Sequence, residues 1–413
     1  MRTIAPLLGL AFFTACNPDV PEVPRQVTDA DPEVARVALE NNAFTLDMHR
    51  AMLAADPAVQ NLFHSPFSMN AALSMTYAGA RGDTATEMES VLHMEQDKAH
   101  HEPLGALLRD LDVSEGRDYS INIANRIWGD ESYSWDAGFL DLNRDEYGAS
   151  VELTDIQGDP DGVRNEINDW VEDETKDKIV DLLPPNSVNA ATAMVLVNAI
   201  HFEADWAESF DKDQTVKADF SRLDGSTVAV DMMNLSTDVA YATGDGFRAA
   251  GLDYGTSGEM RLWVLLPDAI DGLPQVEASL DAATLDSLLD NAETTNLAVA
   301  LPKLEMKSEA KLKKPLSNLG MPTAFGAGAD FSGMAESAAL TIDEVYHQAY
   351  VRIDEEGTEA AAATAVVMTD SADPGQPPAF TVDRPYAFAI RDELTGALLF
   401  FGRVTDPSAS APK

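Results

Sequence analysis

The feature that most constrains the fold is a run of small residues that follows Gly357. The stretch Ile353–Met368 begins with acidic residues and continues in Ala, Thr and Val, with no aromatic residue, Lys, Arg or Pro. If it is a strand, alternate residues from Thr358 to Met368 form one face, and both faces carry small side chains. Such a strand could enter between existing strands without overpacking. The alternative is an Ala-rich helix, because Ala is the best helix former.

The order of an acidic residue, Gly, Thr and a run of Ala resembles the hinge of the reactive-centre loop in inhibitory serpins. The hinge residues in this chain are Glu355, Glu356, Gly357, Thr358, Glu359, Ala360, Ala361, Ala362 and Ala363. In that family the hinge can leave solvent and insert as an extra central strand of a large sheet. The resemblance implies an exposed reactive-centre loop at about 355–379.

Six further segments resemble the same family in the same order along the chain. They are residues 61–68, 73–84, 167–179, 196–210, 380–386 and 399–404. The resemblance covers residues 31–407 and implies an α+β fold, a single large serpin-like domain with helices packed on a large central mixed sheet plus smaller sheets. Tyr386 and Ala387 depart from the usual Phe and larger apolar residue, and the loop before Pro385 is slightly long.

The hydrophobic pattern independently predicts helices in the first half of the chain and strands in the second. Apolar spacing predicts an amphipathic helix over Pro32–Ala54 and a buried helix over Pro66–Ala80. Apolar runs bounded by Gly, Pro or Asp predict strands at Ala193–Phe202, Met260–Pro267, Leu297–Leu304 and Val345–Ile353. This order favours an α+β architecture.

Composition narrows the classes of partner. The chain has 413 residues, 45% of them apolar, without an internal repeat, so we expect one large domain. A formal net charge of −42 predicts a surface that repels nucleic acid and anionic lipid and attracts a basic target. We expect a monomer that needs no cofactor.

The N-terminal residues predict export. Residues 4–13 form an apolar run too short to span a bilayer, and residues 13–16 resemble a bacterial lipobox that ends at Cys16, the single cysteine. We expect a signal peptide at 1–15, a flexible tether at 16–30 and a C-terminal tail at 408–413, with the protein anchored to the bacterial cell envelope by lipid on Cys16. The alternative is an ordinary secretory signal and an extracellular protein.

One enzymatic alternative comes from Ser308 and Lys311, which have the S-x-x-K spacing of penicillin-binding enzymes. The partner motifs S-D-N and K-T-G are missing. The lysines of this segment are more simply interpreted as a solvated positive face; they are Lys303, Lys307, Lys311, Lys313 and Lys314.

The histidines give no catalytic or metal-binding pattern. His100 and His101 are expected in a surface loop, with a weak metal site as the alternative. His64, His201 and His347 lie in apolar contexts typical of hydrogen-bonded core histidines. The serpin resemblance implies a buried structural cluster, the shutter, and an aromatic residue where the loop enters the sheet. The shutter residues are Ser65, Ser68, Asn198 and His347, and the aromatic residue is Trp206.

The resemblance implies a suicide inhibitor of serine proteases rather than an enzyme. Counting from the hinge predicts a reactive bond between Ser371 and Ala372, with Met368–Thr369 as the second choice. A small residue before the bond suits an elastase- or subtilisin-like protease, whereas Met368 suits a chymotrypsin-like or elastase-like one, and a cysteine protease is a further alternative target. Residues 355–380 lack Lys and Arg, which disfavours a trypsin-like target. The alternative function is a non-inhibitory carrier or surface scaffold.

Overall fold

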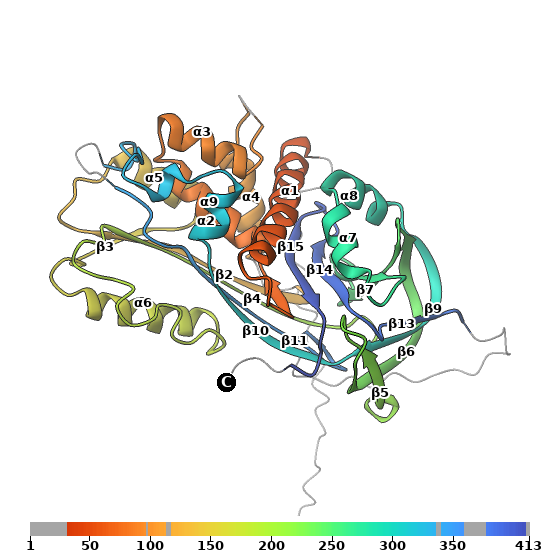
Figure 1. Ribbon diagram of the computed structural model, residues 1–413. Coiled ribbons are helices and arrows are strands. Elements are labelled where there is room, and N and C mark those ends of the chain that lie inside the picture. Colours follow the sequence, from red (N-terminus) through yellow and green to blue (C-terminus); the bar gives the residue numbers. More distant parts are fainter. Residues whose placement is uncertain (1–30, 96–97, 113–116, 336–339, 359–376, 410–413) are drawn as a thin grey trace, which may run out of the picture.

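The computed structural model describes residues 31–95, 98–112, 117–335, 340–358 and 377–409. Over these ranges the chain forms one α+β domain, in which helices pack on two large sheets (Figure 1). The α-helices of the described ranges are α1 (Pro32–Ala55), α2 (Pro66–Tyr77), α3 (Gly82–Val91), α4 (His101–Leu111), α5 (Ala137–Tyr147), α6 (Pro160–Glu174), α7 (Leu273–Ser279), α8 (Ala282–Asp290) and α9 (Lys313–Leu319).

The first sheet carries the hinge. Its strand order is β10-β11-β12-β4-β2-β3, with β11 and β4 parallel where they pair directly and most other neighbours antiparallel. The sheet is therefore mixed, and a two-residue strand lies in its middle. The strands are β2 (Tyr119–Asp130), β3 (Val151–Thr154), β4 (Met194–Asp205), β10 (Leu304–Lys311), β11 (Tyr346–Ile353) and β12 (Gly357–Thr358).

The second sheet has the order β1-β15-β14-β8-β7-β6-β9-β13, and β5 also pairs with β6. Every residue of its strands β14 and β15 is buried, which explains why these C-terminal segments are nearly continuous in apolar residues. The strands are β1 (Leu62–His64), β5 (Val216–Ser221), β6 (Thr227–Thr243), β7 (Phe247–Tyr254), β8 (Met260–Pro267), β9 (Glu293–Pro302), β13 (Ala379–Thr381), β14 (Tyr386–Asp392) and β15 (Leu398–Val404).

Helices cover both faces of the six-stranded sheet (Figure 1). On one face α6 buries Ile167 and Val171 against Trp128 and Val197 of the strands. On the other face the almost fully buried α2 contacts β2 and β4. Helix α2 begins at Ser65, whose hydroxyl accepts a hydrogen bond from the backbone N–H of Ser68 at 3.3 Å. This cap fixes the first turn of α2, and the packing of the helix on β2 and β4 sets its position behind the sheet.

The elements predicted from the hydrophobic pattern are largely confirmed. The predicted helix Pro32–Ala54 corresponds to α1, and the predicted strand Met260–Pro267 corresponds to β8. The segment 167–179, matched to the helix that lies across the sheet, differs more, because α6 begins at Pro160 and ends at Glu174. Lys176 and Asp177 have φ values of 51° and 64°, and a helix cannot continue through this left-handed backbone.

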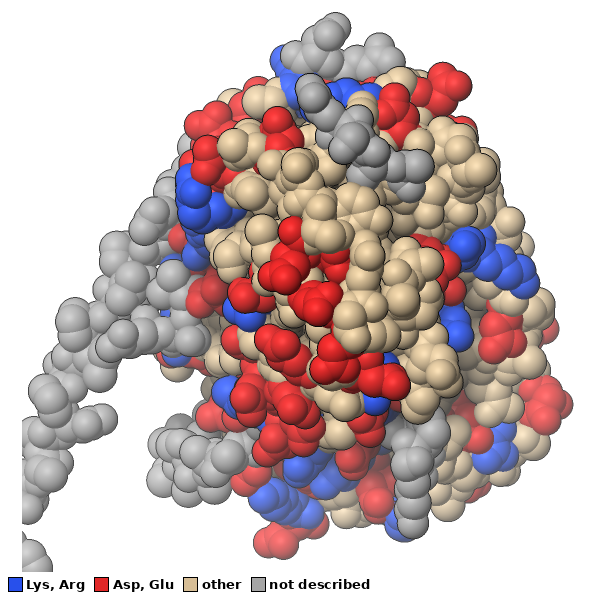
Figure 2. Space-filling view, turned by 90° about the vertical axis from the view of Figure 1, so that its left-hand side faces the viewer, with Lys and Arg blue, Asp and Glu red and all other residues tan. Residues whose placement is uncertain are grey.

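Acidic side chains cover more of the face in Figure 2 than basic ones do, and this face is the side of α5, α6 and β3 in Figure 1. On α6 alone, five acidic residues from Asp161 to Glu174 are exposed. The basic side chains on this face form smaller groups near its edges (Figure 2). The negative charge of the chain is therefore displayed on its folded surface.

Candidate functional site: the hinge at the open end of the six-stranded sheet

The six-stranded sheet is closed at one end and open at the other. At the closed end β11 pairs directly with β4, from Tyr346 opposite Val197 to Ala349 opposite Ile200. Further along the two strands separate and admit β12, in which Thr358 pairs with Ile353 on one side and with Ala204 on the other. The hinge therefore already occupies the first positions of a central strand.

The hinge residues expected at the start of an exposed loop are mostly buried. Residues 354–357 form a tight turn closed by the hydrogen bond from Asp354 N to Gly357 O at 3.0 Å. Glu355 is 4% exposed and Thr358 is 1% exposed, so the expectation that the exposed loop begins at Glu355 is corrected. Glu359, Ala360, Ala361, Ala362 and Ala363 lie outside the described residues, as do Met368, Thr369, Ser371, Ala372 and Cys16.

Gly357 is required by the close approach of the hinge to β4. A Cβ atom added to Gly357 would lie 2.2 Å from the carbonyl oxygen of Ala204 and 2.7 Å from the Cα of Asp205. Both atoms belong to the backbone of β4 and cannot rotate away. The glycine of the hinge motif is therefore explained by packing inside the sheet.

Thr358 and Trp206 fix the inserted end of the hinge. The Thr358 hydroxyl forms a hydrogen bond of 2.5 Å with the hydroxyl of Tyr254, and both side chains are buried. The indole of Trp206 stacks on the Tyr254 ring, with centroids 4.6 Å apart. Its N–H donates to the carbonyl of Asp354 at 2.9 Å. The structure places Trp206 beside the point where the hinge enters the sheet. No local sequence pattern indicates the role of Tyr254.

The acidic residues of the hinge are individually paired. Glu355 accepts hydrogen bonds from Lys303 Nζ at 2.6 Å and from the Thr215 hydroxyl at 2.8 Å. Burial alone would raise the pKa of Glu355, but these two donors outweigh it and hold the pKa below its ordinary value. Glu356 accepts from Lys212 Nζ at 2.7 Å. These contacts connect the hinge to the segments before β5 and between β9 and β10.

The pKa of Asp205 is shifted in the opposite direction to that of Glu355. Burial, together with the negative charges of Glu203, Glu356 and Asp354, raises its pKa. The open end of the sheet therefore gathers several carboxylates around the point where the chain enters it.

The four predicted shutter residues meet at the closed end of the sheet. His347 and Asn198 are direct register partners on β11 and β4, and both are buried. Asn198 Oδ1 accepts from the Ser68 hydroxyl at 2.8 Å and lies 3.1 Å from His347 Nδ1. Ser65 donates its backbone N–H to His347 Nε2 at 3.2 Å and its hydroxyl to the carbonyl of Leu399 at 2.7 Å. These bonds tie α2 to the point where β11 and β4 pair.

The tautomer of His347 follows from these contacts. Because Nε2 accepts the Ser65 N–H, the proton is on Nδ1, which donates to Asn198. Complete burial lowers the pKa of His347 to about 3, so the ring is neutral at physiological pH. The four shutter residues therefore have a structural role, since their hydrogen bonds join α2, β4 and β11.

A second buried histidine cluster lies beside the shutter, and sequence reasoning missed it as a cluster. His64 Nε2 lies 3.1 Å from Nδ1 of His49, whose Nε2 lies 3.0 Å from the Glu277 carboxylate. Arg403 lies 3.3 Å from the other oxygen of Glu277. The apolar context of His64 did predict a core residue. The cluster itself has no local sequence signal, because His64 and Glu277 lie 15 and 228 residues away from His49 along the chain.

Two other expectations about polar residues are settled by the fold. His100 is 7% exposed and contacts both Ser74 and Glu40, and His101 begins α4, so the predicted surface loop at these residues is wrong. The core positions predicted for His64, His201 and His347 are confirmed, since each is at most 2% exposed.

The proposed S-x-x-K pair does not form a site. Ser308 and Lys311 lie three positions apart on β10, so their side chains point to opposite faces of the sheet. The Ser308 hydroxyl instead accepts the backbone N–H of Phe63 at 3.0 Å. A serine–lysine hydrolase therefore has no support in this geometry.

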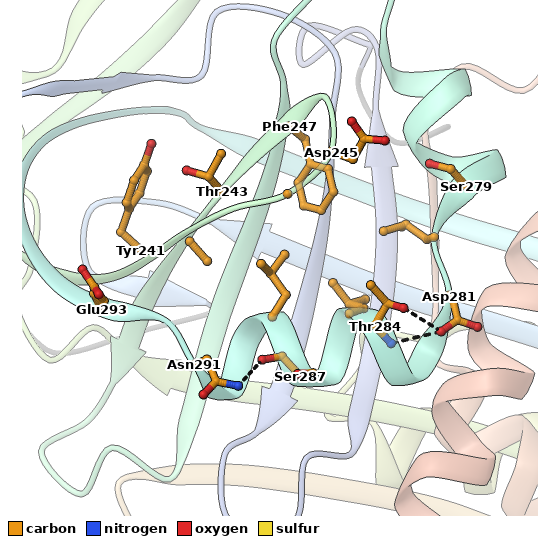
Figure 3. Close-up of a pocket in the computed structure, with 15 residues that line it drawn as sticks. Tyr241, Thr243, Asp245, Phe247, Ser279, Asp281, Thr284, Ser287, Asn291 and Glu293 are labelled. Carbon is orange, nitrogen blue, oxygen red and sulfur yellow. Dashed lines mark hydrogen bonds between the residues drawn. The ribbon is translucent and has the colours of Figure 1, made fainter.

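An open cavity of about 840 Å³ lies between the β6–β7 turn and α8 (Figure 3). Carboxylates of Asp245, Asp281 and Glu293 stand at its rim, and Asp281 is held by Thr284 at the start of α8. None of the described residues that line this cavity is His, Cys, Lys or Arg. It therefore offers no pair of nucleophile and nitrogen base.

The described ranges also contain no group of three or more metal-ligating side chains and no helix long and apolar enough to cross a membrane.

A comparison with known families identifies the class of protein. The family model described as serpin (serine protease inhibitor) matches residues 39–407. The chain belongs to the serpin family.

Relatives and solved structures agree with this assignment. An uncharacterized serpin-like protein of Thermococcus kodakarensis is 36% identical over 89% of this chain and 84% of its own length. The leukocyte elastase inhibitor of Sus scrofa is 34% identical over 90% of this chain and its full length. Uncleaved ovalbumin superposes with a TM-score of 0.80 at 28% identity, covering 90% of this chain and all of its own. Human thyroxine-binding globulin complexed with thyroxine gives 0.79 at 29% identity, covering 91% and 99%.

Proposed function

We propose that this serpin inhibits serine proteases as a suicide substrate. The observation that carries the proposal is the position of Gly357 and Thr358 between β11 and β4, at the open end of the six-stranded sheet. The small residues that follow in the sequence could extend this strand along the gap once the loop is cut.

The chemistry uses the protease's own serine. Its hydroxyl oxygen attacks the carbonyl carbon of the residue before the reactive bond, the peptide bond breaks, and an ester joins the loop to the protease. Insertion of the loop then moves the acylated protease before water can hydrolyse the ester. About ten new ladder hydrogen bonds, each contributing roughly 1 kcal/mol, favour insertion.

We place the reactive bond at Ser371–Ala372, with Met368–Thr369 as the second choice. The small side chain of Ser371 suits elastase- or subtilisin-like proteases. The relative named leukocyte elastase inhibitor supports a target of this kind. A trypsin-like protease is disfavoured because the loop offers no cation for its acidic pocket.

The decisive experiment is incubation with elastase, subtilisin, chymotrypsin and trypsin, followed by denaturing electrophoresis. We expect a covalent band with elastase or subtilisin, and a C-terminal fragment that begins at Ala372 by mass spectrometry. A fragment beginning at Thr369 would support the second choice. Efficient trapping of trypsin would contradict the specificity argument.

The alternative is a non-inhibitory carrier. The likeness to thyroxine-binding globulin, whose solved structure is a complex with thyroxine, favours this alternative. A carrier would be cleaved by the same proteases without a covalent band. The small residues of the hinge argue for inhibition, since a bulky or charged residue there would oppose insertion.

We propose further that the chain is exported and anchored to the envelope through lipid on Cys16. Replacing Cys16 by Ser in the producing bacterium should move the protein from the membrane fraction to the soluble fraction. A Cys16→Ser protein that stays in the membrane fraction would contradict the anchor.

A further inference from the structure

A groove of about 630 Å³ lies where the end of α1, β10 and α9 meet. We call it the lysine groove; it is lined by Met52, Ala55, Asp56, Val59, Leu62, Glu309, Ala310, Lys311, Lys313, Lys314, Pro315 and Glu344. Met52 and Leu62 are each only 6% exposed, and Pro315 is buried as well. The groove therefore has a firmly packed apolar floor. It lies at the Lys311 end of β10, whereas the hinge lies beside Ile353, which pairs with Leu304 at the other end of that strand.

Three lysines stand around this floor. Five of the chain's lysines fall between Lys303 and Lys314, although acidic residues outnumber basic ones 70 to 28 in the whole sequence. Lys313 Nζ donates to the carbonyl of Asp343 at 2.9 Å, and Lys314 Nζ donates to the carbonyl of Ala55 at 3.2 Å. These bonds hold two ammonium groups against the groove by single neutral acceptors.

Lys311 is placed differently, with its ammonium 5.8 Å from the centre of the Tyr346 ring. Within the described residues no ion pair joins Lys311, Lys313 or Lys314 to a carboxylate. Each ammonium has three N–H donors, so all three lysines keep donors for a ligand.

The carboxylates that line the groove are already engaged by donors of the protein. Glu344 accepts the backbone N–H groups of Lys313 and Val345 at 2.9 and 3.0 Å. Glu309 accepts from the Gln348 side chain at 2.7 Å and lies 3.4 Å from Lys307 Nζ. Asp56 accepts the N–H of Ala58 at 3.1 Å. These carboxylates keep their charge, so the lining carries three positive and three negative groups. The acids already accept hydrogen bonds from the protein, whereas the lysine ammonium groups keep free donors.

The cavity of Figure 3 offers a comparison on the same molecule. Its lining contains three carboxylates and no basic residue. The lysine groove therefore differs from that cavity in offering three ammonium groups beside its carboxylates.

We propose that the lysine groove binds a free single-chain amphiphilic anion, with its apolar tail on Met52, Val59, Leu62 and Pro315 and its acidic head against the three lysines. The volume is in the range of small-molecule sites, about 300 to 1,000 Å³. Each buried methylene of the tail contributes about 0.8 kcal/mol, and the head contributes charge-assisted hydrogen bonds.

Calorimetric titration of the full-length protein with dodecanoate, below its micelle concentration, tests the proposal. We expect saturable binding with one ligand per chain, and binding at least tenfold weaker for hexanoate. Dodecylammonium, which has the same tail and the opposite charge, should not bind at this site. Equal binding of the two dodecyl compounds would overturn the assignment of the head to the lysines.

Two variants and a control locate the site. Lys311→Gln combined with Lys314→Gln should weaken dodecanoate binding at least tenfold, and Val59→Ser, in the loop after α1, should weaken it severalfold. Lys217→Gln is the matched control. Lys217 is an exposed lysine on β5, outside the groove, and forms an ion pair with Asp231 on the neighbouring strand β6. If both groove variants bind like the unmodified protein, or if dodecanoate does not bind, the proposal is wrong. Binding to phosphatidylglycerol vesicles without binding of monomeric dodecanoate would equally overturn it, by showing a membrane surface as the ligand.

Discussion

At the scale of single residues, Gly357 shows how closely the hinge is fitted. Replacing it by Ala would push a methyl group into the backbone of β4 at Ala204 and Asp205. We expect Gly357→Ala to destabilise the native form by about 1–3 kcal/mol, as overpacking does. Denaturant unfolding measures this change. Gly328→Ala is the control, since its Cβ would meet only the Thr323 methyl at 3.8 Å. Equal stability of the two variants would show that β12 does not occupy the sheet in solution.

The buried pair of His49 and His64 makes stability depend on pH. Burial lowers the pKa of His49, although Glu277 opposes the shift, and burial together with the charges of His49 and His347 lowers the pKa of His64 well below 6.5. The unfolded chain therefore binds protons below about pH 6.5 that the folded chain does not bind. The contribution of these histidines to the free energy of unfolding is fully present above that pH. It is lost as the pH falls, by up to about 1.4 kcal/mol per pH unit for each such histidine.

His64→Phe tests this dependence while it keeps an aromatic ring beside Phe401. Between pH 6 and pH 5 we expect the slope of unfolding free energy against pH to fall by up to about 1.4 kcal/mol per unit. An unaltered slope in His64→Phe would mean that the pair is already protonated or open in the folded state.

At the scale of elements, the sequence predicted most helices and strands because their signals are local. The apolar spacing of α1 and the short apolar run of β8 give nearly the observed bounds. The state of the hinge could not be predicted in the same way. Its small residues suit a strand, but the position of Thr358 depends on β4, β11 and Tyr254, which lie far away in the sequence.

The same limit applies to the polar clusters. The shutter was predicted only through the family resemblance, and His100 was misplaced because its partners Glu40 and Ser74 are distant in sequence. The polar residues next to His100 in the sequence say little about its burial, because its hydrogen-bond partners come from α1 and α2. The S-x-x-K spacing failed for the related reason that a strand sends residues three apart to opposite faces.

Strand insertion gives a prediction at this scale. Thr358→Arg would place a cation in a site that is 1% exposed, where the Tyr254 hydroxyl offers no negative charge. We expect this variant to be cleaved as a substrate and to form little or no covalent complex with the target protease. Thr358→Val, which keeps the volume and removes only the hydroxyl, should still trap the protease. Unchanged stoichiometry of inhibition for Thr358→Arg would contradict insertion as the trapping step.

At the scale of the whole molecule, full insertion requires the sheet to change its pairing. The direct parallel contact of β11 with β4, from Tyr346 to Ala349, must break, together with the bond between Asn198 and His347. An inserted strand would replace one parallel ladder by two antiparallel ladders, as β12 already does at the open end. The native protein would then be less stable than its cleaved form.

Cleavage of the loop by a protease that is not trapped should therefore stabilise the molecule. About ten ladder hydrogen bonds at roughly 1 kcal/mol each, divided by an unfolding entropy of about 0.8 kcal/mol/K for a domain of this size, raise the Tm by about 12 °C. Calorimetry before and after cleavage measures the shift, with the position of the cut confirmed by mass spectrometry. The cleaved Thr358→Arg protein is the control and should gain much less. An unchanged Tm after complete cleavage of the unmodified protein would identify the chain as a non-inhibitory serpin whose sheet does not accept the loop.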